Sequence, residues 1–517
     1  MAEAVRASYR AGKEDELMEP IVRVDRDGRP FGRIGNRECV IFYNIRGERE
    51  VELSQTLIQP AFAHFQRPPG LLARMVTMIE YSRDLSVRVA FPPIAKVEDT
   101  LTHVLSRHGI RQVKVVESEK AIHVSYFLNG KNADPFPLEE KDVIPSDRNV
   151  TTFDELPQMA IAEVTEALVE KLHDRRYGFV LGNFANVDVV GHNEDEDAVI
   201  QAIEAVDRHT GIVVSEARKA GVLTVITSDH GSVEKRYYPD GAIDTGHSDS
   251  PVPFIIIPAQ GIPAKDILRS GGDLTCVAPT ILDIMGIPIP RAMTGKSLLK
   301  RNLSTAPATA HMTRALLLIL DGWGYRPETS GNLIAEARTP VMDTLIKEYP
   351  WTWLAAAGNA VGMPEGSVGN SESGHLHIGA GRRIPSDLFR IDEAILDGSF
   401  SRNPSFLWAM EESRSRNLPL HLLGIVSFYS SHGSLEHLFA LMDTAKRERV
   451  EKVYIHCLLG RRGEKPESGA LYVDKVEKKA AELGLGEVVT VMGRYWAMDR
   501  EENWDRVEKA YRALVGY

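Results

Sequence analysis

The chain of 517 residues is too long for one ordinary domain, and its length predicts two or three domains. A hydrophobic fraction of 43% and a charged fraction of 26% are those of an average globular protein, and a chain of this length can bury large cores. A net charge of −11 argues against nucleic acid or an anionic membrane as the main partner. A local basic pocket for a small anion is still compatible with that charge.

Cysteine usage and the N-terminal residues bear on the compartment. The cysteines Cys39, Cys276 and Cys457 lie far apart and form no CxxC motif, so the sequence supports neither a disulfide framework nor a thiolate zinc site. The first twenty residues are too charged for a signal peptide, and the longest apolar runs have the length of strands. We therefore expect a cytoplasmic monomer that binds neither membrane nor nucleic acid.

Short apolar runs alternate with amphipathic stretches, a pattern that predicts an α/β fold with a parallel sheet covered by helices. The expected strands, in chain order, are Val40–Tyr43, Tyr177–Leu181, Val222–Thr227, Phe254–Ile257 and Ala315–Leu320. Between two of these strands, a helix is predicted because apolar residues recur near one face. These residues are Val199, Ile203, Val206 and Val213.

Two stretches are candidate boundaries. Residues Arg301 to Met312, RNLSTAPATAHM, are rich in small and polar residues, as linkers are. The sequence FPP at Phe91–Pro93 is a second candidate.

Aspartates and histidines stand at the ends of several expected strands. They are Asp188, His192, Asp229, His230, His247 and Asp321. Because ligands collect at the carboxyl ends of strands in open α/β sheets, these six side chains are candidates for one mixed oxygen and nitrogen site. An isolated DH or DxxxH is more often a surface or capping feature, but the joint occurrence favours metal binding. Such a set suits manganese or zinc better than calcium.

The segment VGNSESGHLHIGAGR places Ser371 in a turn bounded by glycines, with His375 four residues later. A serine that attacks phosphorus needs activation, which a metal ion can supply. Taken alone, the segment favours a serine that caps the start of a helix.

Basic residues form a third set. These are Arg46, Arg49, Lys120, Arg462, Arg494 and Arg500. Arginine offers a planar fork that matches phosphate and carboxylate groups. Each of these residues alone is an ordinary solvated charge, so they gain meaning only as a group.

At these residues the chain resembles the bisphosphoglycerate-independent phosphoglycerate mutases of the alkaline phosphatase superfamily. The matching segments are FYNIRGER, ESEKAIHV, NFANVDVVGH, ITSDHG, GHSDSPVPF, LLLILDGWGYR, VGNSESGHLHIGAGR and MGRYWAMDREENWDRVEKAY. The resemblance implies an alkaline-phosphatase-like doubly wound sheet domain and a second α/β substrate domain. It also implies a small phosphorylated or phosphonylated metabolite as the partner.

The order of the segments differs from the order in the family, whose members begin with the segment that here starts at Met312. The chain therefore resembles a circular permutant whose old termini are joined near 301–312. By this resemblance the metallophosphatase-like domain is expected at 94–385. The substrate domain is expected to be split, at 386–517 and 1–93.

The resemblance also assigns roles to the candidate residues. One metal ion would be held by Asp188, His192 and His247, and a second by Asp229, His230, Asp321 and the Ser371 oxygen. Two divalent ions are implied, manganese first and zinc as the alternative. Lys120 would neutralise charge beside the serine, which forms a phosphoserine intermediate. The substrate would be gripped by Arg46, Arg49, Arg462, Arg494 and Arg500, with His432 nearby.

Two departures from the family pattern alter the expected function. The family segment SDGGVHSH is here SFYSSHGS, with Phe428 in place of an aspartate, and DGRD is here GRRG, with Gly463 in place of another. Glycine cannot do the acid–base work that the resemblance assigns to that second aspartate.

Three hypotheses follow. The first is a diverged transferase acting on a phosphoglycerate-like hydroxy acid, with a phosphonate or an activated donor as one option. The second is an ordinary mutase that interconverts 3- and 2-phosphoglycerate. The third is a non-catalytic metal-binding homologue, which the retention of Ser371, Lys120 and the six ligands disfavours.

Overall fold

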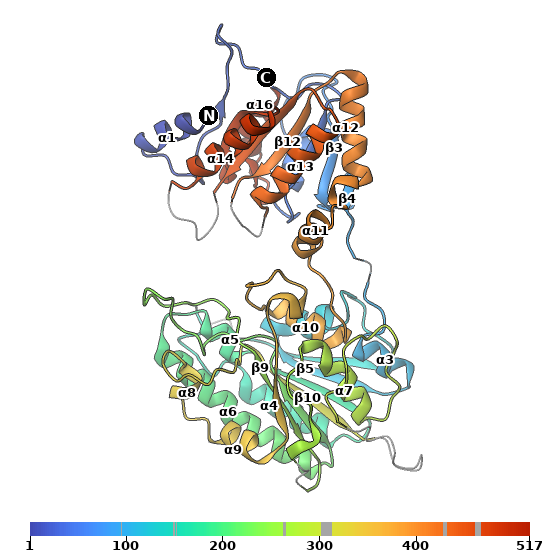
Figure 1. Ribbon diagram of the computed structural model, residues 1–517. Helices are drawn as coiled ribbons and strands as arrows, with labels where there is room; N and C mark the ends of the chain where they lie inside the picture. The colour runs from blue at the N-terminus through green and yellow to red at the C-terminus, as the bar shows by residue number, and fades with distance from the viewer. Residues whose placement is uncertain are drawn as a thin grey trace. The chain divides into compact units, whose positions relative to one another are not determined.

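The computed structural model describes residues 1–94, 96–147, 150, 152–261, 265–300, 313–427, 432–460 and 467–516. The chain divides into two compact units, one made of Met1–Pro93 with Asp387–Tyr517 and the other of Ile94–Ser386 (Figure 1). The two ends of the chain thus build one unit together, and its middle builds the other. The expected linker at 301–312 lies outside the described residues.

The unit built from the two chain ends holds, in its described part, a seven-stranded sheet of order β1-β14-β13-β12-β2-β3-β4. Its strands are β1 (Ile21–Val22), β2 (Cys39–Phe42), β3 (Arg74–Ile79), β4 (Arg88–Phe91), β12 (Leu420–Ile425), β13 (Val453–Leu459) and β14 (Glu487–Gly493). All neighbours pair in parallel except β1, which runs antiparallel to β14. Its helices are α1 (Ala2–Arg10), α2 (Val51–Ile58), α11 (Asp387–Leu396), α12 (Pro404–Arg416), α13 (Leu435–Arg447), α14 (Gly469–Leu483), α15 (Arg494–Ala497) and α16 (Trp504–Val515).

The strand order of this sheet reverses at one place. From the centre, β12, β13 and β14 follow one another toward one edge, while β2, β3 and β4 follow one another toward the opposite edge. The chain therefore leaves β2 and β12, which are paired neighbours, in opposite lateral directions. In open α/β sheets the loops that diverge at such a point leave room for a ligand at the carboxyl ends of the strands.

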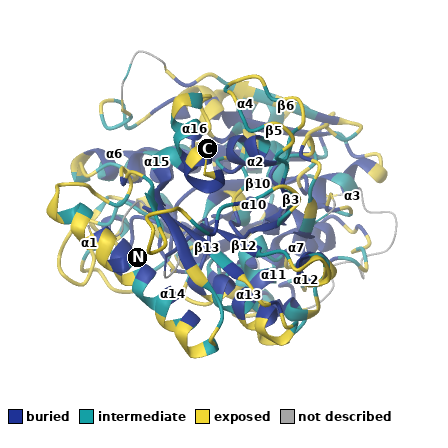
Figure 2. Ribbon diagram, turned by 90° about the horizontal axis from the view of Figure 1, so that it is seen from above, coloured by how far each residue is buried: buried dark blue, intermediate teal, exposed yellow. Residues whose placement is uncertain are grey.

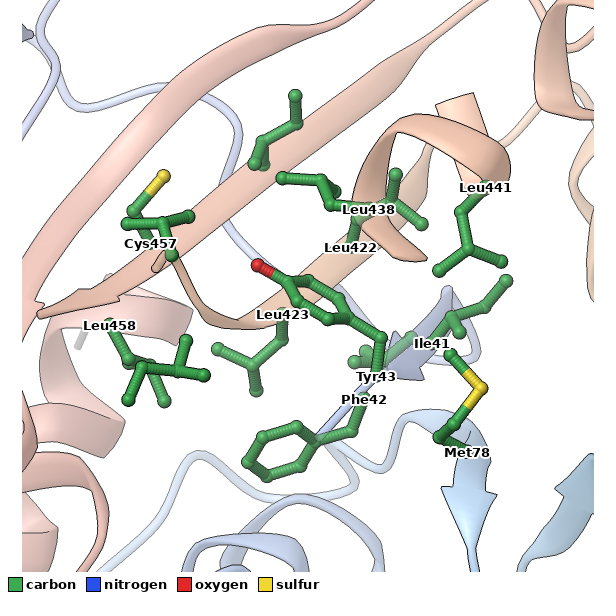
Figure 3. Packing of buried hydrophobic residues seen from close by; sticks show 14 of the residues in the cluster. Ile41, Phe42, Tyr43, Met78, Leu422, Leu423, Leu438, Leu441, Cys457 and Leu458 are labelled. Atoms are coloured by element: carbon green, nitrogen blue, oxygen red, sulfur yellow. The ribbon is translucent and has the colours of Figure 1, made fainter. Parts of the chain in front are cut away.

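One hydrophobic core holds this unit together. Figure 3 shows Tyr43 from the end of β2 lying among leucines of β12 and α13, including Leu422, Leu438 and Leu441. The strands β12 and β13 are buried on both faces, whereas the covering helices α13 and α14 turn exposed faces outward (Figure 2). Strands buried on both faces are typical of parallel sheets between helices.

The middle unit holds, in its described part, a second seven-stranded sheet of order β11-β9-β8-β10-β7-β5-β6. Its strands are β5 (Gln112–Glu117), β6 (Glu139–Ile144), β7 (Phe179–Phe184), β8 (Leu223–Thr227), β9 (Val252–Ile257), β10 (Ala315–Leu320) and β11 (Trp351–Leu354). Its α-helices are α3 (Leu101–Arg107), α4 (Ile161–His173), α5 (Asn186–Gly191), α6 (Glu196–Lys219), α7 (Val277–Ile284), α8 (Leu333–Glu336), α9 (Pro340–Glu348) and α10 (Ser371–Ala380). Shorter helical turns are η1 (Ser118–Lys120), η2 (His123–Phe127), η3 (Lys265–Ile267), η4 (Leu274–Cys276) and η6 (Gly358–Val361), and in the other unit η7 (Phe400–Arg402).

The central strand β10 separates two cores. Leu316, Leu318 and Leu320 belong to the core that includes α4 and α6, and Leu317 and Ile319 belong to the core that includes α3 and α7. Because successive side chains of a strand point to opposite faces, a continuous run of leucine and isoleucine fills both cores. The sequence predicted this strand with the bounds that the structure has.

The α/β class is confirmed, and so are the other expected strands and the helix, with small shifts. The largest shift concerns the strand expected at Tyr177–Leu181, because β7 continues through Gly182 and Asn183, which interrupt the apolar run. The sheet is not wholly parallel, since β9 runs antiparallel to β8 and β11 antiparallel to β9. A loop without a crossover helix joins β8 to β9, and such a connection returns the chain antiparallel. No helix among the described residues is long and apolar enough to cross a membrane.

A buried ion pair links two strands of the middle unit. The Lys114 ammonium in β5 lies 2.8 Å from a Glu139 carboxylate oxygen in β6, and both side chains are buried. Asn129 joins them, accepting from Lys114 at 2.6 Å and donating to both Glu139 oxygens at 3.0 Å. Burial lowers the pKa of Lys114 to about 8, so its charge depends on the carboxylate.

We expect Lys114→Met to lower the free energy of unfolding by about 3–5 kcal/mol, because it leaves the Glu139 charge buried without its partner. The double variant Lys114→Met/Glu139→Gln recovers most of the loss, since a neutral amide needs no counter-charge. Urea denaturation followed by circular dichroism measures both. Lys141→Met, on the exposed side of β6, is the control and stays within about 0.5 kcal/mol of wild type. The account would be contradicted if Lys114→Met and Lys141→Met had the same midpoint of urea unfolding.

Candidate active site

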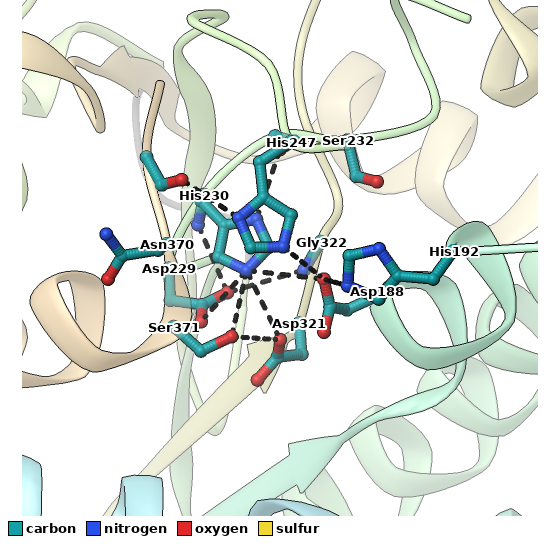
Figure 4. Close-up of polar contacts among 12 residues, drawn as sticks. Asp188, His192, Asp229, His230, Ser232, His247, Asp321, Gly322, Asn370 and Ser371 are labelled. Carbon is teal, nitrogen blue, oxygen red and sulfur yellow. Dashed lines mark hydrogen bonds and ion pairs between the residues drawn. The ribbon is translucent and has the colours of Figure 1, made fainter. Parts of the chain in front are cut away.

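The expected ligands gather at one edge of the sheet in the middle unit (Figure 4). Asp321 directly follows β10, Asp188 lies in α5 after β7, and Asp229 and His230 follow β8. His247 precedes β9 instead of following it. Because β9 runs antiparallel to β8, its start lies at the edge where the parallel strands end, so His247 joins the others.

Ser371 occupies the first position of α10, and its hydroxyl lies among the charged groups. Its Oγ lies 2.7 Å from the Lys120 ammonium and 2.9 Å from Nε2 of His230, and it donates to Asp321 at 3.2 Å. The same Lys120 ammonium donates to Asp188 and to Asp321, each at 2.6 Å. One lysine thus joins the serine to two buried carboxylates that come from different strands.

The electrostatics of this cluster are set by burial and by opposite charges. Burial alone would raise the pKa of Asp188 and of Asp321, but the Lys120 ammonium holds both well below their usual range. Burial alone would lower the pKa of His230, but the carboxylates around it, led by Asp229, raise it to about 10. The negative charges are therefore retained and draw positive charge toward them.

The three histidines share an orientation that suits metal ligands. In each, Nδ1 lies within hydrogen-bond distance of a backbone carbonyl oxygen, at 2.8 Å for His192, 3.1 Å for His230 and 2.9 Å for His247. A carbonyl only accepts, so these contacts place a proton on Nδ1 and direct Nε2 of each ring toward Asp188. Histidines that bind metals are commonly held in this way.

The carboxylates complete candidate metal sites. Oδ1 of Asp188 lies 3.1 Å from Nε2 of His247 and 3.5 Å from Nε2 of His192, and all three are close enough to share one ion. Neither this Oδ1 nor Oδ2 of Asp229 accepts a hydrogen bond within the described part of the chain. Buried oxygens that accept no hydrogen bond and face the Nε2 atoms of these imidazoles fit a divalent cation.

Asp321 belongs to two further groups of potential ligands that overlap. It can share an ion with Asp188 and His230, or with Asp229 and His375. The structure thus brings all six expected Asp and His residues, Ser371 and Lys120 into one connected cluster.

Glycine allows the close approach of α10 to this cluster. A side chain on Gly374 would collide with the backbone oxygen of Asp229, and one on Gly322 would meet the backbone of Asp188 at 2.8 Å. The glycines around Ser371 and after Asp321 therefore permit the packing of ligand-bearing loops against one another.

The sequence analysis missed three residues of this cluster as site residues. Nδ1 of His375 lies 3.1 Å from Asp229, and Asn183 donates to Asp321 at 2.9 Å. His123 lies behind them with its ring 5.7 Å from that of His375, and burial lowers its pKa to about 4. Signals existed for two of them: His375 stands four residues after Ser371 on one helix face, and Asn183 interrupts an apolar strand.

The expected substrate residues belong to the other unit. Arg46 and Arg500 both contact Glu48, at 3.1 and 2.9 Å, and Arg49 donates to the backbone of Met498 at 3.2 Å. Arg494 begins α15 at the end of β14, with its side chain largely buried. The structure brings Arg46, Arg49 and Arg500 together beside the carboxyl end of β2. Arg462, Phe428 and Gly463 lie outside the described residues.

Two family models match the chain. The model described as BPG-independent PGAM N-terminus matches residues 391–517, and the model described as Metalloenzyme superfamily matches residues 15–289, more than half of the chain. A 2,3-bisphosphoglycerate-independent phosphoglycerate mutase of Thermomicrobium roseum is 42% identical over 304 residues, which cover 57% of each chain. Another, of Methanosarcina barkeri, is 47% identical over 209 residues, 40% of each.

One solved structure is also similar to the chain. It is a Leishmania mexicana phosphoglycerate mutase crystallised at low cobalt concentration, with 29% identity, a TM-score of 0.39 and coverage of 53% of each chain. The chain spans little more than half of the length of such curated relatives.

We expect divalent manganese to raise the thermal unfolding temperature of the wild type and to have little effect on Asp321→Asn. Asp321 belongs to two of the three ligand groups, so its loss weakens both. A ligand at a hundred times its dissociation constant stabilises the folded state by about 2.7 kcal/mol. Asp207→Asn is the control, because Asp207 is equally buried in the same unit but only accepts from backbone amides. An unchanged manganese effect in Asp321→Asn would contradict the assignment.

Proposed function

The chain belongs to the metalloenzyme superfamily, and from that premise we propose that it is a member of the 2,3-bisphosphoglycerate-independent phosphoglycerate mutase family and transfers a phosphoryl group through Ser371. Membership implies divalent metal ions and an enzyme of the phosphotransferase type. The proposed substrate is a phosphoglycerate-like hydroxy acid.

The observation that carries this proposal is the position of the Ser371 hydroxyl. It lies at the positive end of α10, within hydrogen-bond distance of Lys120, His230 and Asp321. Anions are favoured at helix N-termini, and a nucleophile needs a neighbour that accepts its proton. The position of Ser371 thus provides a nucleophilic oxygen, a neighbouring group that accepts its proton, and a positive environment for phosphoryl oxygens.

We assign Asp188, His192 and His247 to one metal ion, and Asp229, His230, Asp321 and the Ser371 oxygen to the other. When bound, the ions supply positive charge for the transferring group and favour the ionised serine. Manganese is the proposed metal, with zinc as the alternative.

The proposed reaction has two halves. Ser371 Oγ gives its proton to the Asp321 carboxylate to which it donates and attacks phosphorus, the bond from phosphorus to the substrate oxygen breaks as that oxygen takes up a proton, and phosphoserine forms. A hydroxyl then loses its proton and attacks the phosphoserine, its oxygen bonds to phosphorus, the bond to Oγ breaks, and the proton on Asp321 returns to Oγ. The Lys120 ammonium offsets charge on the phosphoryl oxygens in both halves.

The other unit is the proposed substrate domain. Arg46, Arg49 and Arg500 converge beside β2, and Arg462 and Arg494 are proposed to join them in binding phosphate and carboxylate. We also propose a cytoplasmic monomer.

The loss of two family aspartates, at Phe428 and Gly463, supports divergence from a simple mutase. Neither residue has a side chain that exchanges protons, although one of the replaced aspartates handles a substrate proton in the family. The transfer through Ser371 is therefore proposed to persist, with weaker proton transfer at the substrate or with another acceptor.

Circular permutation is part of the proposal. A model described as an N-terminus matches the C-terminal residues 391–517, and the two ends of the chain build one sheet. Both features fit a family chain that has been opened inside its substrate domain and joined near 301–312.

We expect turnover of 3-phosphoglycerate to 2-phosphoglycerate to be about 10²–10⁴-fold below that of the Thermomicrobium roseum relative, which is the usual size of general acid–base assistance. A coupled steady-state assay with manganese measures both enzymes, and Ser371→Ala is expected to abolish the activity. Equal turnover would replace this proposal with that of an ordinary mutase. Undetectable turnover with manganese bound would favour the non-catalytic alternative.

Joining Tyr517 to Ala2 and opening the chain before Met312 is expected to give a folded, active enzyme, because permutation is tolerated where breaks fall outside the packed core. Far-ultraviolet circular dichroism, manganese binding and the coupled assay check the reordered chain. A reordered chain that folds but binds no manganese would count against the permutation.

A further inference from the structure

A carboxylate and a histidine meet at the point where the strand order of the end-built unit reverses. Glu50 lies in the turn after β2, and His432 lies in the loop after β12. Because β2 and β12 are parallel neighbours, both loops leave the same edge of the sheet. This is the position at which open α/β sheets bind ligands.

Glu50 is held in one orientation. Its side chain is fully buried, with one oxygen accepting from the Asn44 amide at 2.7 Å and the other from the backbone of Arg49 at 3.1 Å. Asn44 is itself fixed, because its own oxygen accepts from the backbone of Ile425 at the end of β12 at 2.8 Å. The carboxylate is therefore built into the junction of the two strands.

His432 is the partner of this carboxylate. Its Nδ1 lies 3.4 Å from the Glu50 oxygen that also binds Asn44, and its side chain is 6% exposed. Its backbone oxygen accepts from Ile45 at 2.8 Å, which ties the loop after β12 to the loop after β2. The charged groups nearest to Glu50 in sequence are Arg46, Glu48 and Arg49, which precede it, and Glu52, which follows it.

Burying a carboxylate is costly unless it is paired, so a fully buried one beside a histidine calls for an explanation. A carboxylate on one ring nitrogen fixes the ring orientation and stabilises the imidazolium. The other nitrogen, Nε2, is then the atom that holds or moves a proton.

We infer that Glu50 is a positioning residue that orients His432 for proton exchange with the substrate hydroxyls. This inference rests on the proposed function. It names a group that handles the substrate proton in a chain where Gly463 replaces the family's aspartate. In this inference His432 is the group that exchanges protons with the substrate, and Glu50 acts through it.

The protons balance over the two halves of the reaction. As phosphorus leaves the first substrate oxygen for Ser371, that oxygen takes the proton from Nε2 of the His432 imidazolium. As the second hydroxyl attacks phosphoserine, its proton returns to Nε2. His432 ends as it began, and the Glu50 carboxylate stays ionised throughout.

The same strand offers a matched control. Glu38 immediately precedes β2 and lies 2.9 Å from Nε2 of His421, so it also forms a carboxylate–histidine pair. That pair lies at the amino end of the parallel strands, away from Asn44 and the arginines. Glu38→Gln therefore makes the same chemical change at the opposite end of the same strand.

The kinetic test compares kcat and KM for 3-phosphoglycerate with manganese present. We expect Glu50→Gln to lower kcat about 10²-fold with KM within about threefold, and Glu50→Asp to fall between it and wild type. Glu38→Gln keeps kcat within about twofold. The double variant Glu50→Gln/His432→Gln falls no lower than His432→Gln alone, because the two residues act as one unit. Independent losses that multiply, or a loss confined to KM, would overturn the inference.

A second measurement decides the inference without turnover. In protein labelled with ¹⁵N-histidine, the His432 signals are assigned by their absence from His432→Gln. We expect Nδ1 of wild-type His432 to carry a proton that Glu50→Asp retains with a shifted resonance. A wild-type His432 whose Nδ1 carries no proton, with the proton on Nε2, overturns the positioning role. This result does not depend on whether Glu50→Gln folds. If the wild-type protein has no transfer activity, the proposed function is contradicted instead. The tautomer of His432 then still tests whether Glu50 orients this histidine.

Discussion

The active-site region depends on one electrostatic constraint, which is the concentration of three buried aspartates at the end of a parallel sheet. Asp188, Asp229 and Asp321 lie in the segments that follow three different strands, and none can be ionised there without positive charge beside it. The Lys120 ammonium supplies part of that charge by bonding to two of them. Oxygens that accept no hydrogen bond and the Nε2 atoms of the histidines supply the remaining ligand atoms for divalent cations.

The same constraint explains why the serine belongs to this place. A phosphoryl group is itself an anion, so it approaches a cluster of carboxylates only where cations outweigh them. Ser371 stands where lysine, the imidazole of His230 and the start of α10 meet. In the other unit the balance is different, since Arg46, Arg49 and Arg500 lie together and the buried carboxylate of Glu50 lies beside a histidine. The proposed function assigns phosphorus to the first of these centres and the anionic substrate to the second.

Much of this site could be predicted from the sequence, because β-strands of apolar residues end at charged ones. The run Ala315–Leu320 followed by Asp321 predicts both a buried strand and a ligand at its end. What could not be predicted depends on pairing between distant segments. The antiparallel direction of β9, which brings His247 to the ligand edge, follows from its pairing with β8. The contact of Glu50 with His432 follows from β2 lying beside β12, two strands that are far apart in the chain. Asn183 was missed because a polar residue in a strand argues against the strand until its partner is known.

The central claim is that Ser371 carries the phosphoryl group, and trapping that group tests it most directly. The manganese-loaded enzyme is mixed with 3-phosphoglycerate, quenched in acid within milliseconds, digested and analysed by mass spectrometry, with Ser373 of the same peptide as the internal comparison. The account predicts one added phosphate on Ser371, lost when the quench follows exhaustion of the substrate. A phosphate on another residue, or transfer that proceeds without any phosphorylated peptide, would contradict it.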